Sequence, residues 1–195
     1  MPLEDAELRR RAGRLGWLLL DVDGVFTDGR LYYGGGGERL KVFHVRDGLA
    51  VRLAQRGGLK VGVLSGRASP GLSRRLTELG LDAMITGRSD KARAFAEFLD
   101  RHGAEPGRVA YAGDDLLDLP VLERVGLSFA PADAVAEVRA AVDRVLAAPG
   151  GGGAVRELVE LLLAARGSWP GLIDRLLERS GEPVLEGPIL ENKEP

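Results

Sequence analysis

Polar side chains that could do chemistry follow four apolar, strand-like runs of the sequence. The first run, WLLLD, ends at Asp21, and a second acid, Asp23, comes two residues later. Serine, glycine and arginine follow the second run, a lysine begins the helix after the third, and a glycine with three acids follows the fourth. These residues are Ser65, Gly66 and Arg67, then Lys91, then Gly113, Asp114, Asp115 and Asp118.

The chemistry that suits this set is phosphoryl transfer. Gathered carboxylates repel one another and are tolerated around a hard cation such as Mg²⁺, which also attracts phosphate oxygens. A hydroxyl, backbone N–H groups and an ammonium complete a cradle for the phosphoryl group. One aspartate can act as the nucleophile, and a second carboxylic acid can protonate the leaving oxygen and then activate water.

The elements that must position these residues alternate between strand and helix. Such alternation predicts an α/β fold, a three-layer, doubly wound parallel sheet whose ligands bind outside the carboxyl ends of the strands. The expected strands are 17–21, 59–64, 82–85, 109–112, 127–130 and 144–146, and the expected helices are 47–56, 70–79, 89–102, 115–125 (broken by Pro120), 134–141 and 154–166.

Length and composition exclude several classes of protein. The chain has 195 residues, a net charge of −2 and no cysteine, which fits one domain without disulfides or thiolate metal sites. A near-neutral charge gives no reason to expect nucleic-acid or membrane-surface binding. The N-terminus lacks the apolar core of a signal peptide and no long apolar run exists, so we expect a cytoplasmic location.

The four motifs DVDGVFTD, LSGR, DK and GDDLLD resemble, in this order, those of the haloacid dehalogenase superfamily. The longer stretches, from DVDGVFTDGRLYY through VGVLSGR and then GDDLLDLPVLERVGLSFAPADA, are similar to its 3-deoxy-D-manno-octulosonate 8-phosphate phosphatase family. The resemblance covers about residues 17–167. Any one of these residues alone is more often a turn, a helix cap or a solvated side chain, but four ordered motifs favour the catalytic interpretation.

The resemblance implies roles for the residues that match its motifs. Asp21 would be the nucleophile and a Mg²⁺ ligand, and Asp23 would be the general acid and base with its backbone carbonyl on the metal. Ser65 would hold the phosphoryl group and Lys91 would neutralise its charge. Asp114 would be the third protein ligand of Mg²⁺.

Further residues are expected to bind the substrate. Gly66 would donate its N–H to the phosphoryl group, while Asp115 and Asp118 would support the metal waters and Lys91. Arg67 is a candidate for a sugar-acid carboxylate because a guanidinium binds one bidentately; the alternative is an ordinary surface ion pair. Arg156 would contact the ligand in a neighbouring subunit, unless it is a solvated helix residue.

The spacing of the motifs leaves no room for a cap domain. Only a β-hairpin flap, at about residues 30–43, and one helix fit between Asp23 and Ser65. In the resembling family a homotetramer covers the uncapped site: the hairpins associate and a neighbour's C-terminal segment, here 150–156, reaches in. We therefore expect a phosphatase domain over residues 1–167 and an extension over 168–195, a short helix followed by disorder.

The function expected from these features is Mg²⁺-dependent hydrolysis of a phosphorylated sugar acid, 3-deoxy-D-manno-octulosonate 8-phosphate, through an aspartyl-phosphate. Two alternatives remain open. The same chemistry could act on a nonulosonate 9-phosphate or another small phosphomonoester, or the chain could be a non-catalytic assembly subunit of a larger enzyme.

Overall fold

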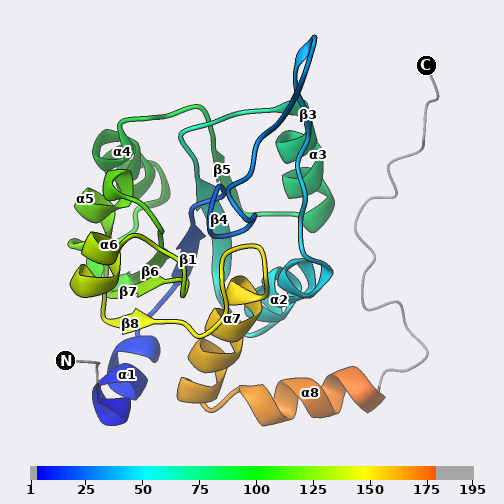
Figure 1. Ribbon diagram of the computed structural model, residues 1–195. Helices are drawn as coiled ribbons and strands as arrows, with labels where there is room; N and C mark the ends of the chain where they lie inside the picture. The colour runs from blue at the N-terminus through cyan, green and yellow to red at the C-terminus, as the bar shows by residue number, and fades with distance from the viewer. Residues whose placement is uncertain (1–3, 179–195) are drawn as a thin grey trace.

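The fold is built on one six-stranded parallel sheet. A computed structural model describes residues 4–178, with helices on both faces of this sheet (Figure 1). The strand order is β5-β4-β1-β6-β7-β8. The strands are β1 (Trp17–Leu20), β4 (Lys60–Leu64), β5 (Ala83–Ile85), β6 (Val109–Ala112), β7 (Leu127–Ala130) and β8 (Arg144–Val145). The predicted doubly wound α/β architecture is confirmed.

The helices divide into two layers, as their buried residues show. One layer holds α1 (Asp5–Ala12), α2 (Val45–Arg56), α3 (Pro70–Leu79) and α7 (Ala154–Ala165), which share one apolar cluster. The other holds α4 (Lys91–His102), α5 (Leu119–Leu122) and α6 (Ala136–Ala141), which share a second. Strand β1 is buried on both faces because it lies between the two layers.

The register of the central strands brings their carboxyl ends to one level. Leu20, the last residue of β1, is opposite Val63 of β4 and Ala112 of β6. Asp21 continues the ladder, since its N–H donates to the carbonyl of Ala112 at 2.9 Å. The loops that begin at Asp21, Ser65 and Gly113 therefore start side by side at the same edge.

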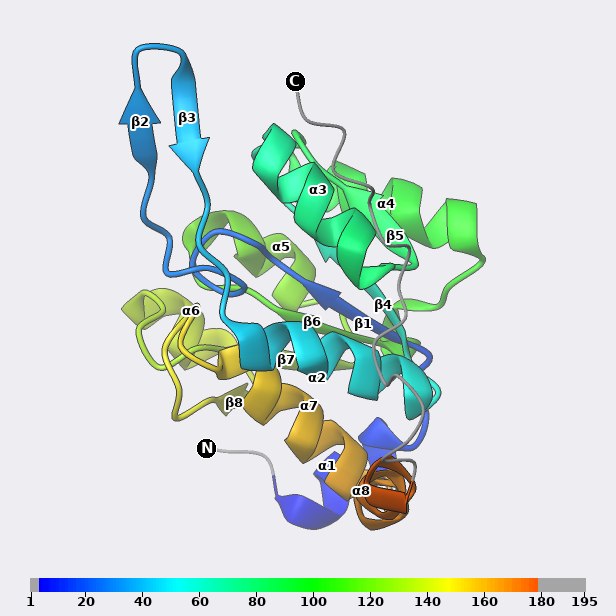
Figure 2. The same cartoon turned by 90° about the vertical axis from the view of Figure 1, so that its right-hand side faces the viewer.

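The segment between β1 and α2 forms the predicted hairpin and no cap domain. Strands β2 (Tyr32–Gly34) and β3 (Gly37–Leu40) pair antiparallel and extend away from the sheet above the carboxyl ends of the strands (Figure 2). Between α4 and β6 there is only a 3₁₀ turn, η1 (Pro106–Arg108). Both intervals are fully described, so neither of them inserts a cap domain.

Several local predictions were wrong. Pro120 does not break a helix: a 3₁₀ turn, η2 (Leu116–Asp118), leads into α5, and Pro120 lies in the first turn of α5, where a missing N–H is tolerated. Helix α4 begins at Lys91, two residues after the expected start at residue 89, because Asp90 is its N-cap and accepts a hydrogen bond from the N–H of Arg93. Helix α1 was not predicted; it is short and largely charged, and only Leu8 and Ala12 of it are buried.

The last described element is α8 (Trp169–Glu178), a helix where a short amphipathic one was expected. It packs beside α7, with Leu172 buried in the first apolar cluster. The disorder expected after it falls on residues 179–195, outside the described part of the chain. Within residues 4–178 no helix is long and apolar enough to cross a membrane.

Candidate active site

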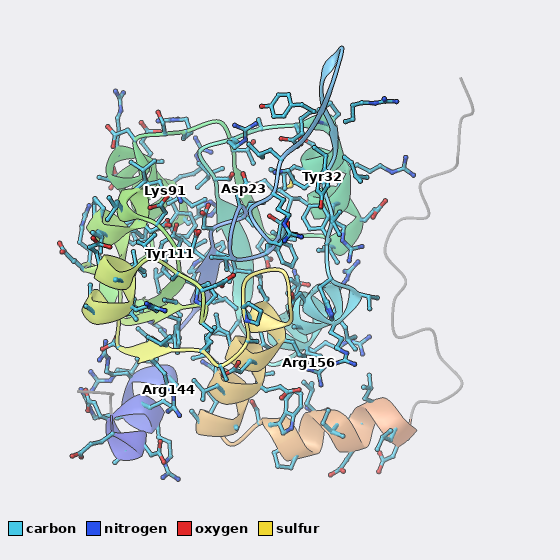
Figure 3. The ribbon with its side chains drawn as sticks, viewed as in Figure 1. Asp23, Tyr32, Lys91, Tyr111, Arg144 and Arg156 are labelled. Carbon is cyan, nitrogen blue, oxygen red and sulfur yellow. The ribbon has the colours of Figure 1, made fainter. Side chains whose placement is uncertain are left out.

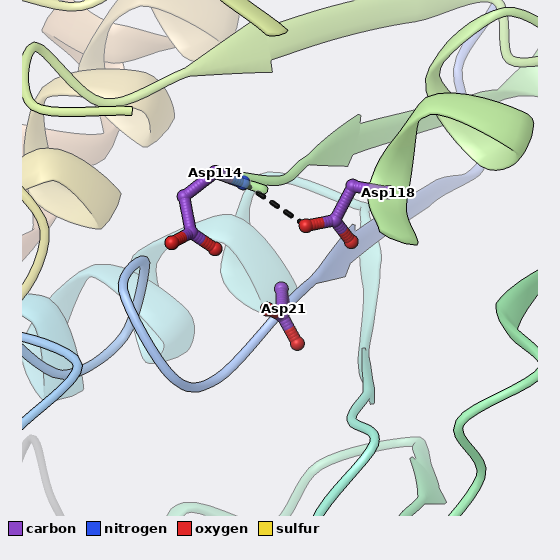
Figure 4. A group of neighbouring side chains, drawn as sticks. All are labelled: Asp21, Asp114 and Asp118. Carbon is purple, nitrogen blue, oxygen red and sulfur yellow. Dashed lines mark hydrogen bonds between the residues drawn. The ribbon is translucent and has the colours of Figure 1, made fainter. Parts of the chain in front are cut away.

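The centre of the candidate site is a cluster of three aspartates at the ends of β1 and β6. Asp21, Asp114 and Asp118 each place a carboxylate oxygen within 4.8 Å of those of the other two (Figure 4). Asp21 and Asp118 are buried. Holding three carboxylates this close together in their ionised form is costly where water is excluded, so the cluster needs positive charge near it.

Lys91 supplies one positive charge from the first residue of α4. Its Nζ lies 3.0 Å from Asp21 Oδ1 and 2.5 Å from Asp118 Oδ1. The lysine is itself buried. Burial alone would lower the pKa of Lys91, but the carboxylates of Asp21 and Asp118 outweigh it and the pKa is raised. Lys91 is therefore a fixed ammonium between two carboxylates.

Asp118 is the anchor of this lysine. Besides Lys91 it accepts a hydrogen bond from the Tyr111 hydroxyl and from the backbone N–H groups of Asp114, at 3.1 Å, and Asp115, at 3.2 Å. With all these donors its oxygens are occupied by protein. Asp118 thus orients Lys91 and the loop after β6, leaving Asp21 and Asp114 to face a ligand.

One ammonium does not balance three carboxylates. Burial, together with the Asp118 carboxylate, raises the pKa of Asp21 to about 6, although Lys91 opposes the shift. Burial and the carboxylates of Asp21 and Asp118 raise the pKa of Asp114 to about 8. The protein alone therefore does not keep the whole cluster ionised near neutral pH.

The residues present fit a divalent cation. Asp114 Oδ1 is buried and has no hydrogen-bond partner within the described residues. The carboxylate of Asp114 lies against the backbone of Gly24, where an added Cβ would come within 2.0 Å of Oδ2. A hard cation favours an all-oxygen site of this kind. Asp21 and Asp114 could both serve as ligands here.

Asp23 lies on the hairpin side of the cluster, between two cations. Its Oδ1 accepts a hydrogen bond from Lys41 Nζ, and its Oδ2 is 3.9 Å from Arg67 Nε. Lys41 follows β3 and is almost fully buried. Sequence reasoning missed Lys41, because its proximity to Asp23 depends on the path by which the hairpin returns to the sheet.

Ser65 begins the loop after β4. It is buried, its N–H donates to the carbonyl of Ile85 at 2.8 Å, and its Oγ accepts from the N–H of Arg67 at 3.2 Å. Gly66 follows in open space, because an added Cβ there would meet only the Cα of Ser89, at 3.9 Å. The loop therefore leaves room for a ligand beside its backbone.

Two of the predicted substrate residues lie outside this cluster. The exposed Asp115 caps η2, accepting from the N–H of Leu116 at 2.7 Å, and makes no ion pair with Lys91. The Arg156 guanidinium binds Glu160 and lies over the Trp169 ring, and Figure 3 shows it near α8 and away from Asp23. Their roles toward substrate stay predictions.

The segment 150–156 lies against its own chain. The N–H of Gly151 donates to the carbonyl of Val25 at 3.1 Å, and a Cβ at Gly150 would overlap the carbonyl of Gly24 at 1.8 Å. Asp47 of α2 accepts from the N–H of Arg156 at 2.8 Å, which covers the start of α7. The contacts of Gly150 and Gly151 thus hold the loop that follows β1 in place. Reaching into a neighbouring site is a prediction that the single chain does not test.

Comparisons with known proteins identify the family to which the chain belongs. Residues 81–158 match the haloacid dehalogenase-like hydrolase family. The 3-deoxy-D-manno-octulosonate 8-phosphate phosphatase of Haemophilus influenzae is 42% identical over 160 residues, which are 82% of this chain and 89% of that protein. A cobalt-bound structure of the Haemophilus influenzae phosphatase has a TM-score of 0.78 at 43% identity, over 80% of this chain and 92% of the other.

A second solved structure is that of the Moraxella catarrhalis phosphatase in complex with magnesium, phosphate and 3-deoxy-D-manno-octulosonate. It has a TM-score of 0.84 at 33% identity, and the match covers 87% of this chain and 98% of the other. The shared fold and the extent of identity lead to one assignment. The chain belongs to the 3-deoxy-D-manno-octulosonate 8-phosphate phosphatase family of haloacid dehalogenase-like hydrolases.

Proposed function

We propose that the protein hydrolyses 3-deoxy-D-manno-octulosonate 8-phosphate to 3-deoxy-D-manno-octulosonate and phosphate, with Mg²⁺ as its cation. The observation that carries the proposal is the buried cluster in which Asp21, Lys91 and Asp114 meet at the sheet edge, in a chain of this family. When bound by Asp21, Asp114 and the backbone carbonyl of Asp23, Mg²⁺ would offset carboxylate charge and that of the phosphoryl oxygens.

The first half of the reaction uses Asp21 as the nucleophile. One carboxylate oxygen of Asp21 attacks phosphorus, and the bond between phosphorus and the sugar oxygen breaks, which leaves an aspartyl-phosphate. Asp23 gives a proton to the departing sugar oxygen. Lys91, held by Asp118, faces the charge that develops on the phosphoryl group, and Ser65 and the Gly66 N–H hold that group in place.

The second half returns the enzyme to its starting state. Asp23, now a carboxylate, takes a proton from a water molecule, whose oxygen attacks phosphorus and releases Asp21 and phosphate. Lys41 and Arg67 flank Asp23 and keep its carboxylate over the site. The guanidinium of Arg67 is the candidate partner of the substrate carboxylate.

The site would be completed by association of subunits. The hairpin and its exit expose apolar side chains at Leu31, Tyr33, Leu40, Val42 and Val45. An exposed apolar group on a flap beside an uncapped site supports the expected homotetramer with sites at its interfaces. Arg156 would then act across that interface, and light scattering of the purified protein measures the subunit number.

A phosphate-release assay tests the proposed function. We expect Mg²⁺-dependent release from 3-deoxy-D-manno-octulosonate 8-phosphate, with a lower kcat/KM for a nonulosonate 9-phosphate and for p-nitrophenyl phosphate. Asp21→Asn should abolish release, whereas Asp174→Asn, an exposed residue on α8, should not change it. Equal rates for wild type and Asp21→Asn would contradict the mechanism. A higher kcat/KM for the nonulosonate 9-phosphate would make that compound, and not the octulosonate 8-phosphate, the substrate.

A further inference from the structure

A glutamate of the hairpin lies between the two cations that flank Asp23. Glu38 belongs to β3, and its Oε2 is 3.3 Å from Arg67 Nη2 while its Oε1 is 3.7 Å from Lys41 Nζ. The Ser69 side chain lies close enough to stabilise the charge of Glu38. Only 10% of the Glu38 side chain is exposed, although it stands on a hairpin that extends from the body.

Glu38 is held there as a carboxylate. Burial alone would raise its pKa, but the Ser69 side chain and the charges of Lys41 and Arg67 outweigh burial and lower it. Its Oε1 is nevertheless buried without a hydrogen-bond partner within the described residues. The carboxylate of a sugar acid has the same charge and the same hydrogen-bond acceptors as this side chain.

Both N–H groups of Arg67 Nη2, the nitrogen needed for bidentate binding of a carboxylate, already have partners. Its Nη2 donates to the Tyr33 hydroxyl at 2.7 Å and to Glu38 at 3.3 Å. A carboxylate that binds a guanidinium through two parallel hydrogen bonds uses Nη2 in both the side-on and the end-on arrangement. An incoming carboxylate must therefore displace one of these partners, and the longer of the two hydrogen bonds is the one that Glu38 accepts.

Both partners come from one cross-strand pair. Tyr33 of β2 and Glu38 of β3 are opposite each other in the hairpin register. The hairpin is thereby attached to the loop that begins at Ser65, and release of Glu38 would free one of its two contacts with Arg67. The hydrogen bonds to Arg67 thus couple the position of the hairpin to whether Arg67 binds Glu38 or another anion.

We propose that Glu38 is an internal competitor for the substrate carboxylate: it occupies the Lys41 and Arg67 cations in the free enzyme and is displaced when the sugar acid binds. The inference rests on the proposed function, since it takes a carboxylate-bearing ligand as given. The fraction of enzyme with Glu38 displaced limits the apparent affinity, so removing the competing charge strengthens binding of the acid. It also makes Glu38 a determinant of specificity, because a ligand without a carboxylate gains nothing from its displacement.

Calorimetry on the Mg²⁺-loaded protein tests this with a matched pair of ligands, 3-deoxy-D-manno-octulosonate and its methyl ester. The measured quantity is the ratio of the Kd for the ester to the Kd for the acid. For Glu38→Gln we expect this ratio to rise about three- to fivefold, the range that partly exposed ion pairs supply. Glu38→Ala, which lacks the amide as well, should raise it in the same direction.

The control variant is Glu78→Gln. Glu78 also bridges two arginines, Arg74 at 3.2 Å and Arg75 at 3.5 Å, but it lies on α3 and outside the site. Its ratio should equal that of wild type. If Glu38→Gln weakens both ligands equally, Glu38 only braces the hairpin and the inference is overturned.

The two proposals fail in different ways. A wild type that releases phosphate from the octulosonate 8-phosphate, with an unchanged ligand ratio in both Glu38 variants, would overturn the role of Glu38 alone. A wild type that neither releases phosphate from that compound nor binds the acid more tightly than the ester would overturn both.

Discussion

Replacing Gly24 with alanine should disturb the candidate metal site far more than it disturbs the rest of the fold. Gly24 has φ +94°, and a Cβ there would lie 2.0 Å from Asp114 Oδ2 and 2.4 Å from its Cγ. Ordinary van der Waals contact begins at 3.4 Å, so the Asp114 carboxylate or the loop after β1 must move by about 1.4 Å. Both groups belong to the candidate metal site.

The magnitude has two parts. A non-glycine residue in the left-handed region costs about 1–2 kcal/mol of stability. The displacement acts on function: a shift of about 1 Å in a reacting group can lower the rate ~100-fold. We therefore expect kcat/KM to fall about 100-fold or more, with at least a ~10-fold rise in the Mg²⁺ concentration that gives half-maximal activity.

Gly103→Ala is the matched control. Gly103 has φ +58°, and no atom lies within 4 Å of a Cβ added there, so it carries the backbone strain without the collision. Both variants should lose a similar few degrees of Tm, while only Gly24→Ala should lose activity and Mg²⁺ affinity. Phosphate release titrated with Mg²⁺ measures this. A Gly24→Ala enzyme with the Mg²⁺ dependence of Gly103→Ala would refute the placement of Asp114 as a ligand.

Two more predictions follow from the charges of the cluster. Lys91→Met removes the ammonium between Asp21 and Asp118. It should lower the free energy of unfolding of the metal-free protein, measured in urea, by about 3–5 kcal/mol, and it should abolish phosphate release. A stable, active variant would contradict the role of Lys91. Burial raises the pKa of Asp21 to about 6 and that of Asp114 to about 8. Above about pH 4 the metal-free folded protein therefore binds more protons than the unfolded chain, and the free energy of unfolding falls as the pH rises from about 4 to 8. The increase in Tm on adding Mg²⁺ should therefore be larger at pH 8 than at pH 5, and Asp114→Asn should lose most of this difference; an equal increase at both pH values would contradict it.

The sheet and the central cluster were accessible from the sequence for a simple reason. Apolar runs that alternate with helices predict parallel strands, and parallel strands place the residues after them at one edge. Asp21, Lys91, Asp114 and Asp118 do meet at that edge. For these residues, local spacing and one topological rule were enough.

Residues whose position depends on tertiary paths were not accessible. Lys41 and Glu38 meet Asp23 and Arg67 only because the hairpin returns over the sheet edge, which no local pattern specifies. Tyr111 was one residue of an apolar strand, and only the fold shows its hydroxyl on Asp118. The signal that could have predicted this contact is a tyrosine in a buried apolar strand that is followed directly by aspartates.

The most direct test of the account is whether phosphorus becomes attached to Asp21. In a rapid-quench experiment with octulosonate 8-phosphate labelled in its phosphoryl group, acid-quenched wild-type protein should carry the label on the peptide that contains Asp21, before free phosphate reaches its steady rate. Asp21→Asn should show neither labelled protein nor phosphate release. Release at the wild-type rate from Asp21→Asn, or label on a different residue, would contradict the account.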